Sequence, residues 1–162
     1  MAVAAGIMVP HPPLIVPDVG RGQEILIKDT IKAYQEAAGM AAELKPDTLV
    51  VISPHAVMYA DYFHVSPGKE ARGDFGRCMA PQIGVEAGYD EAFVRELDRL
   101  CGDDDFPMGT EGEREKELDH GTLVPLYFIN QHYRDYKLVR IGGSGLSFAD
   151  HYRAGRYIAR AA

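Results

Sequence analysis

Apolar positions along the chain fall into short continuous runs and helically spaced stripes, and this alternation predicts an α/β protein. Ala2–Val9 and Thr48–Ile52 are short apolar runs, each typical of a β-strand. Between them, the apolar residues of Gln23–Leu44 recur at helical spacing, which predicts one long amphipathic helix. Together the three segments predict a strand–helix–strand unit with parallel strands. Thr48–Ile52 is apolar throughout, as expected of a central strand covered on both faces.

The rest of the chain continues this alternation. Asp61–Ser66 alternates weakly and is consistent with a strand, whereas the glycines of Pro67–Pro81 indicate a loop. Further strands are expected at Gln82–Ala87 and Lys137–Ile141, and further helices at Tyr89–Cys101, Leu123–His132 and Phe148–Ala161. The inward positions expected in the first of these helices are Phe93, Val94, Leu97 and Leu100. The predicted architecture is a mostly parallel or mixed central sheet with helices on both faces.

Composition limits the partners and the compartment. The 162 residues suffice for one domain with a substantial core, and the net charge of −7 disfavours nucleic-acid binding, which needs a basic surface. No apolar stretch is long enough for a membrane span, and no positive segment precedes the first run as in a signal peptide. Cys78 and Cys101 lack CxxC spacing, which suits a reducing cytoplasm and excludes a cysteine-based structural zinc site.

Two histidines follow the two apolar runs at equivalent positions. His11 lies among three prolines that stiffen the backbone, and His55 follows Ser53 and Pro54. Each histidine alone is compatible with an incidental residue in a turn. Because open α/β sheets bind ligands outside the carboxyl ends of their strands, the two together favour a metal site. Imidazole ligands suit iron, zinc, copper or nickel.

His120 is a candidate for proton transfer. It follows Asp119 at the expected start of a helix, where the helix dipole favours the neutral imidazole and Asp119 favours the charged form. A histidine so balanced can accept and return a proton near neutral pH. An alternative is equally compatible with the position: Asp119 caps the helix and His120 lies on the surface.

Other polar features carry weaker signals. His64 alternates with Tyr62 along the weak strand, and whether it lines a pocket stays open. His132 and His151 are expected on helix surfaces. Gly142–Ser147 follows a strand and precedes a helix, but it matches neither the dinucleotide nor the P-loop pattern. A tight strand–helix turn is therefore favoured over a phosphate-binding loop. Its place on the same sheet edge as His11 and His55 is consistent with contact to a substrate.

Four segments, spread over nearly the whole chain, carry a resemblance to a known family. They are Val9–Leu14, Val50–His55, Leu118–Leu126 and Ile141–Ser147. Together they resemble the LigB-type catalytic subunit of class III extradiol ring-cleavage dioxygenases, within the Memo-like superfamily. The chain is most similar to the branch found in the bacterial AmmeMemoRadiSam system. In that branch such a domain accompanies an AMMECR1-like domain and a radical-SAM protein, which become expected partners.

The resemblance implies a non-heme Fe(II) site that opens a catechol-type ring with O₂. In the family two histidines and a glutamate hold the iron, and His11 and His55 match the two histidines. His120 matches the acid/base histidine that handles the protons of the catechol. Zinc or another divalent metal is an expected substitute for iron. Related subunits dimerise, so the resemblance also favours a homo-oligomer.

One part of the family pattern has no counterpart in these residues. The family's glutamate ligand follows a further strand in a C-terminal part, and no glutamate here lies in a matching context, so the third ligand is left unassigned. Residues 1–162 are therefore expected to be the N-terminal portion of a single LigB-like domain. Such a portion should bind Fe(II) weakly and expose a sheet edge, and its activity as a separate chain is left open.

Two other functions are compatible with the same residues. The first is a Memo-like, non-oxygenase protein that binds a metal or takes part in redox chemistry linked to a radical-SAM protein. The second is a zinc-dependent hydrolase in which His11 and His55 bind zinc and His120 acts as a general base. Oxygen consumption with catechols distinguishes the first from a dioxygenase, and zinc retained with hydrolytic activity would support the second.

Overall fold

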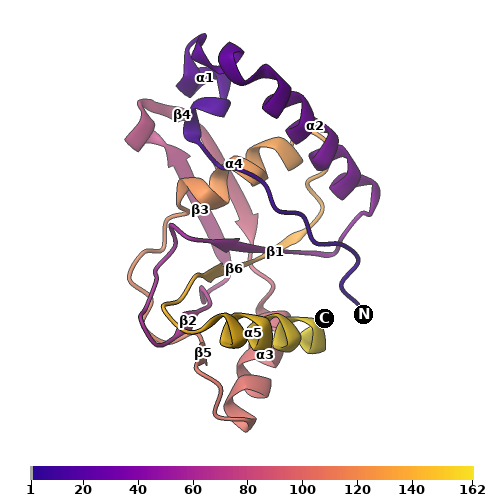
Figure 1. Ribbon diagram of the computed structural model, residues 1–162, viewed down its shortest axis with the longest axis vertical. Coiled ribbons are helices and arrows are strands. Elements are labelled where there is room, and N and C mark those ends of the chain that lie inside the picture. The colour runs from indigo at the N-terminus through magenta and orange to yellow at the C-terminus, as the bar shows by residue number, and fades with distance from the viewer. Residues whose placement is uncertain (1) are drawn as a thin grey trace.

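The protein is a mixed α/β structure, as the sequence predicts (Figure 1). The computed structural model describes residues 2–162. The described strands are β1 (Thr48–Ser53), β2 (Phe63–His64), β3 (Glu70–Phe75), β4 (Ala80–Gly88), β5 (Met108–Gly109) and β6 (Lys137–Gly142). The described helices are α1 (Pro17–Gly20), α2 (Lys28–Glu43), α3 (Glu91–Asp103), α4 (His120–Ile129) and α5 (Phe148–Ala161), with 3₁₀ helices η1 (Pro13–Ile15), η2 (Gln23–Ile27) and η3 (Gly76–Cys78).

Strand β6 lies at the centre of the sheet system. Strand β1 pairs with it in parallel, from Thr48 opposite Lys137 to Ser53 opposite Gly142. Strands β2 and β5 form a short parallel pair, and β3 and β4 an antiparallel pair. Single backbone bridges join the ends of β2 and β4 to β6. The carboxyl ends of β1 and β6 therefore lie side by side.

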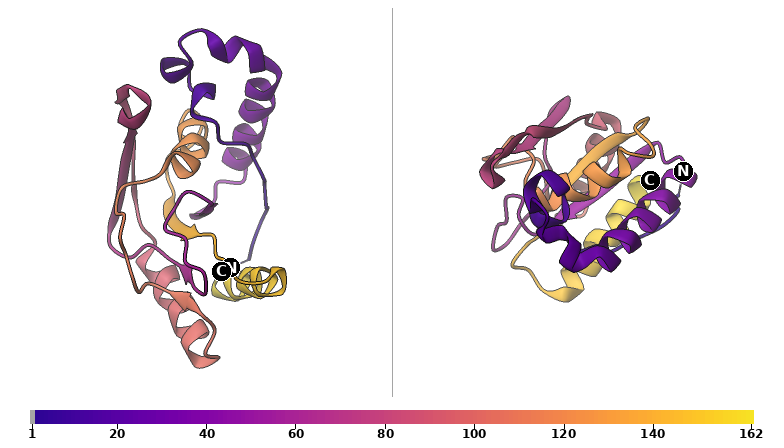
Figure 2. Two further views of the ribbon diagram at one scale, coloured as in Figure 1. Left: turned by 60° about the vertical axis from the view of Figure 1, so that its left-hand side comes forward. Right: turned by 90° about the horizontal axis from the view of Figure 1, so that it is seen from above.

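Helices cover both faces of the β1–β6 pair, as expected (Figures 1 and 2). Leu138 of β6 packs in a core with α2 and α4, whereas Val139 and Ile141 pack in a second core with α3 and α5. This alternation follows from the pleat of a strand. The inward positions predicted for α3 are confirmed, since all of them are buried: Phe93, Val94, Leu97 and Leu100.

Capping side chains determine where α3, α4 and α5 begin. Asp90, Asp119 and Ser147 each precede a helix and accept a hydrogen bond from a backbone N–H in its first turn. Such a cap stabilises a helix by about 1 kcal/mol because it satisfies a donor that has no partner within the helix. The cap at Asp119 starts α4 at His120, the start that the sequence predicts, whereas the helix ends at Ile129 and not at the predicted His132.

The predicted first strand is wrong. Residues 2–9 form an extended surface segment with Val3, Ile7 and Met8 exposed. A strand requires backbone hydrogen bonds to a neighbour, and no segment among residues 2–162 pairs with this run. The parallel strand–helix–strand unit predicted from it is therefore also wrong for the described residues. His11 therefore lies in an irregular, proline-rich segment and not after a strand.

The loop predicted over Pro67–Pro81 is also wrong, because most of it forms β3 and the tight connection to β4. Glycines in this stretch suggested a loop, but Gly73 serves a different purpose. A Cβ at Gly73 would lie 2.7 Å from the backbone oxygen of Leu118, so glycine allows the segment before α4 to pass directly over β3.

Two predictions about the β1 region are confirmed only in part. Thr48–Ile52 forms a strand, but Ile52 is 60% exposed, because among the described residues β1 has only β6 as a neighbour. The helix predicted over Gln23–Leu44 begins with η2 and continues as α2, with Tyr34 and Ala38 of its apolar stripe buried. Within residues 2–162, no helix combines the length and apolar character needed to cross a bilayer.

Candidate metal centre

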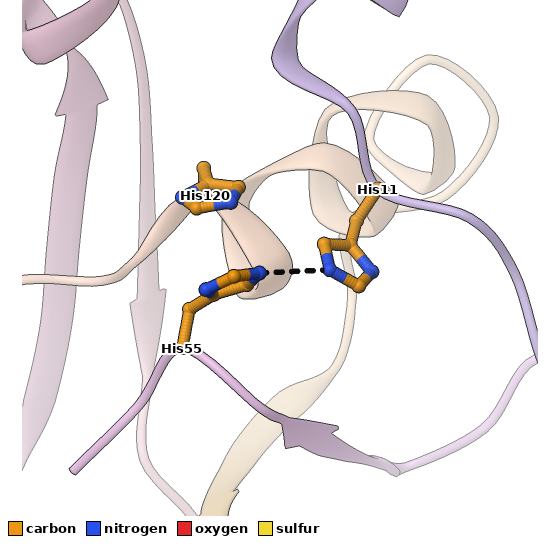
Figure 3. A group of neighbouring side chains, drawn as sticks. All are labelled: His11, His55 and His120. Atoms are coloured by element: carbon orange, nitrogen blue, oxygen red, sulfur yellow. Dashed lines mark hydrogen bonds between the residues drawn. The ribbon is translucent and has the colours of Figure 1, made fainter.

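His11, His55 and His120 converge although they come from distant parts of the sequence (Figure 3). One nitrogen from each ring lies within 4.8 Å of those of the other two. The Nε2 atoms of His11 and His55 are 3.0 Å apart, and the ring centroids of His55 and His120 are 4.0 Å apart. The structure therefore brings together all three residues selected from the sequence.

A different local device positions each of the three histidines. His11 lies just before η1, where the flanking prolines restrict the backbone. His55 lies in the turn after β1, and its backbone N–H donates to the Ser53 hydroxyl at 3.1 Å. His120 is the first residue of α4 and follows the capping Asp119. The cluster thus joins the end of a strand, the start of a helix and the N-terminal segment.

The donor set suits a divalent transition metal. Imidazole nitrogen is a good ligand for iron, zinc, copper and nickel, and one nitrogen from each of the three rings lies close to those of the other two. Within residues 2–162, no carboxylate or thiolate joins this group. The His55 side chain is exposed and the other two are partly exposed, so a further ligand or a substrate can approach from solvent.

The surroundings of His120 favour its neutral form. Burial is the largest cause that lowers the pKa of its imidazole, and the neighbouring His55 and His11 lower the pKa further. The carboxylate of Asp119 raises this pKa, but the net shift is downward. The position at the positive end of α4 acts in the same direction as burial. A neutral imidazole at neutral pH is ready to accept a proton from a bound substrate.

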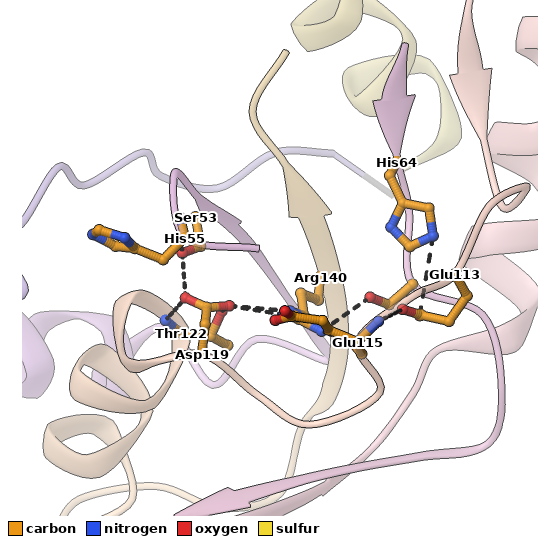
Figure 4. A network of polar contacts seen from close by, with 9 residues as sticks. Ser53, His55, His64, Glu113, Glu115, Asp119, Thr122 and Arg140 are labelled. Atoms are coloured by element: carbon orange, nitrogen blue, oxygen red, sulfur yellow. Dashed lines mark hydrogen bonds and ion pairs between the residues drawn. The ribbon is translucent and has the colours of Figure 1, made fainter. Parts of the chain in front are cut away.

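A buried ion pair lies behind the histidines (Figure 4). Oδ2 of Asp119 accepts hydrogen bonds from Nε and Nη2 of Arg140 at 3.2 and 3.0 Å. Burial alone would raise the pKa of Asp119, but the Ser53 hydrogen bond, the charge of Arg140 and the Thr122 hydroxyl together hold it below its usual value. Asp119 is therefore an ionised group held by β1, β6 and α4 at once.

Sequence reasoning missed Arg140, although a signal was present. Arg140 interrupts the apolar run of β6, and its side chain is 1% exposed. A fully buried arginine is rare unless it is paired, so a charged residue in such a strand predicts a partner. Besides Asp119, the guanidinium donates from Nη1 to the carbonyl oxygen of Glu115 at 2.9 Å. Arg140 thus also fixes the segment that leads into α4.

His64, whose role the sequence left open, lies outside the histidine cluster and is fully buried on β2. Its Nε2 has no hydrogen-bond partner among the described residues and lies 4.0 Å from Oε2 of Glu113. Burial, helped by the charge of Arg140, lowers the pKa of His64, while Glu113 partly offsets the shift. The net effect favours a neutral imidazole inside the protein.

The pKa of His64 predicts a loss of stability in mild acid. Because its pKa is lower in the folded than in the unfolded state, the folded state binds fewer protons. Its contribution is present above the unfolded pKa, about 6.5, and is lost as the pH falls through the lower folded pKa. In urea unfolding between pH 8 and pH 5, His64→Gln should therefore show a weaker pH dependence than the unmodified protein. The exposed His132→Gln variant is the control, and equal slopes for both variants would contradict the assignment.

The surface positions predicted for His132 and His151 are confirmed, although His132 lies in the turn after α4 and not within a helix. His132 and His151 lie on the surface, where they contact Gln35 and the backbone of Ser147. The glycines after β6 form a tight turn, and a Cβ at Gly142 would overlap the carbonyl oxygen of Val57. This turn requires glycine because another part of the backbone passes against it, which explains the glycines without a phosphate.

Residues 5–162 match the family described as the catalytic LigB subunit of aromatic ring-opening dioxygenase. The chain belongs to this family. The LigB-family chain is also 35% identical over 161 residues to Protein CA_C1420 of Clostridium acetobutylicum, with 95% of the chain and 34% of that protein covered. The chain thus spans about a third of the length of this relative.

Family membership confirms the resemblance carried by the four sequence segments at the level of LigB. The family description names the catalytic subunit of an aromatic ring-opening dioxygenase, and members of this family typically depend on a metal. The three-histidine cluster is the group within residues 2–162 that has the composition and spacing of a metal site. The cluster is therefore the candidate active site of the LigB-family chain.

Proposed function

We propose that this LigB-family chain contributes the metal-binding and proton-transfer histidines of an Fe(II)-dependent extradiol dioxygenase. The observation that supports the proposal is the convergence of three imidazoles at one solvent-accessible point in a member of a ring-opening family. His11 and His55 are the proposed iron ligands, and His120 is the proposed acid/base residue. The substrates are a catechol-type aromatic and O₂.

The residues divide the work as follows. When bound, Fe(II) supplies a centre at which the diol and O₂ are held together in one orientation. His11 and His55 present imidazole nitrogens from two separate backbone segments. His120, kept neutral by its surroundings, accepts a proton from a diol hydroxyl and later returns it to the ring-opened product. The exposed side of His55 leaves room for an aromatic ring to enter.

The family resemblance also implies a carboxylate ligand, and none of residues 2–162 supplies one at the cluster. With imidazoles alone, this site lacks the carboxylate of the facial triad typical of non-heme Fe(II) oxygenases. We therefore expect weaker iron binding by these residues alone than by a protein that adds the carboxylate. For this reason the test of function uses the protein in its full natural length.

Oxygen uptake tests the proposal directly. The full-length protein is loaded anaerobically with Fe(II), and O₂ is admitted with protocatechuate or simpler catechols. We expect stoichiometric oxygen consumption and a yellow ring-opened product. A protein with one bound iron per chain that consumes no oxygen with any catechol would contradict the proposal.

A second candidate is a Memo-like metal-binding or redox protein without oxygenase activity. The all-imidazole donor set favours it, because this set differs from two histidines and one carboxylate. Under this alternative, the proposed partners are an AMMECR1-like domain and a radical-SAM protein, and a homo-oligomer is expected under either function. Bound iron without oxygen uptake, together with binding to the radical-SAM protein, would favour this candidate.

A further inference from the structure

We propose that the hydroxyl of Ser53 is a positioning group that fixes His55 relative to His120. The inference rests on the proposed function, because it concerns how that site is held in shape. Ser53 is the last residue of β1 and is fully buried, two residues before His55. It therefore lies where the strand meets the loop that carries the histidine.

The Ser53 hydroxyl makes two contacts that join the two histidine-bearing segments (Figure 4). It donates to Oδ1 of Asp119 at 2.5 Å, and it accepts from the backbone N–H of His55 at 3.1 Å. A hydroxyl has one proton to donate and lone pairs to accept with, so both contacts are satisfied at once. Asp119 directly precedes His120. The hydrogen bonds of this one hydroxyl therefore link the two segments within a few covalent bonds of each histidine.

Close packing at Gly121 reinforces this connection. A Cβ on Gly121 would overlap the Ser53 hydroxyl and would lie 3.2 Å from Cδ2 of the His55 ring. Only hydrogen at this position lets the first turn of α4 approach both groups. The absence of a side chain at Gly121 and the hydroxyl of Ser53 are thus two parts of one fitted contact.

The far side of the Asp119 carboxylate is held by the strand next to β1. Oδ2 binds the buried guanidinium of Arg140, which lies on β6. Since β1 and β6 are paired throughout, Ser53 and Arg140 reach Asp119 from a single rigid framework. A movement of His55 relative to His120 would break the Ser53 contacts. The hydroxyl therefore opposes the displacement that would separate the two imidazoles of a shared site.

The other end of β1 supplies a matched comparison. The Thr48 hydroxyl donates to Oδ2 of Asp90 at 2.6 Å, and Asp90 caps α3 by accepting from the N–H of Phe93 at 3.0 Å. This is the same chemistry, a β1 hydroxyl bound to a capping aspartate. No residue of the histidine cluster is near it in sequence. A purely structural role for the Ser53 hydroxyl would therefore be mirrored by Thr48.

The test compares Ser53→Ala with Thr48→Ala. Co(II) binding is measured by equilibrium dialysis and by the visible absorption of the bound ion, and urea unfolding is measured alongside. Both variants should lower the unfolding midpoint. We expect Ser53→Ala alone to weaken Co(II) binding, by about 10- to 100-fold as for other residues that orient metal ligands, and to change the Co(II) spectrum. Equal effects of the two variants on Co(II) affinity, or no effect of either, would overturn the proposal.

Gly121→Ala tests the same contact from the other side and serves if Ser53→Ala fails to fold. The added methyl should displace His55 and weaken Co(II) binding by a similar factor. The double variant Ser53→Ala/Gly121→Ala removes the overlapping hydroxyl, so its loss of Co(II) affinity should be smaller than the sum of the two single losses. Additive losses in the double variant would overturn the proposed contact.

A second readout separates this inference from the proposed function. In the metal-free protein, NMR cross-peaks between the His55 and His120 rings report their proximity without any turnover. We expect Thr48→Ala to keep these cross-peaks and Ser53→Ala to lose them. Cross-peaks unchanged in Ser53→Ala would overturn the positioning role. Absence of oxygen uptake in the unmodified protein, with the Ser53 effects present, would instead refute only the dioxygenase proposal.

Discussion

Replacing either His11 or His55 with alanine is expected to abolish stoichiometric metal binding. The three ring nitrogens lie within 4.8 Å of one another, and no carboxylate or thiolate of residues 2–162 joins them. Loss of one proposed ligand therefore leaves only the other proposed ligand and His120, too few donors to hold the metal stoichiometrically. Removal of an outer-shell partner already costs roughly 10- to 100-fold in metal affinity, and loss of a direct ligand should cost more.

Equilibrium dialysis against Fe(II) under anaerobic conditions measures this effect, with metal content determined per chain. His132→Ala is the matched control, since this histidine is exposed and binds Gln35 at the surface. We expect the control to bind metal like the unmodified protein. If His11→Ala bound iron with unchanged affinity, the assignment of His11 as a ligand would be wrong.

Parts of the fold that depend on local chemistry could be predicted from the sequence. The inward residues of α3 follow from helical spacing, and the start of α4 follows from Asp119, whose carboxylate accepts from the N–H of Thr122. The prediction that His11 and His55 lie close together rests partly on a strand over Ala2–Val9, and residues 2–9 form no strand. The family resemblance and the position of His55 after β1 led to the same three residues that the structure brings together.

The features that escaped prediction depend on contacts between distant segments. Gly73 is a glycine because Leu118 crosses it, and Gly121 is a glycine because Ser53 and His55 pack against it. Neither reason is visible from the neighbouring residues. The sequence alone therefore predicts a loop around Gly73, where the structure has strand β3. Arg140 has the same property, since its partner Asp119 is remote in sequence. Local patterns specify elements, whereas these pairs specify how the elements meet.

His120→Ala is expected to leave the metal bound and to remove most of the turnover. A positioned general acid or base typically contributes about 10²- to 10⁴-fold to a rate, and His120 is the partly buried imidazole whose pKa is lowered beside the proposed ligands. The His120 side chain takes no part in the hydrogen bonds from Ser53 and Thr122 to Asp119, so its removal keeps them. The change should therefore act on chemistry more than on folding.

Two measurements on His120→Ala separate the two roles that the geometry allows this residue. The Fe(II) dissociation constant tests whether His120 is a ligand, and kcat for oxygen uptake tests whether it transfers protons. A residue that transfers protons leaves the dissociation constant unchanged and lowers kcat by about 10²- to 10⁴-fold. Metal loss as complete as in His11→Ala would instead make His120 the third ligand. The site would then be a three-imidazole centre, and the proton would have to pass through another group.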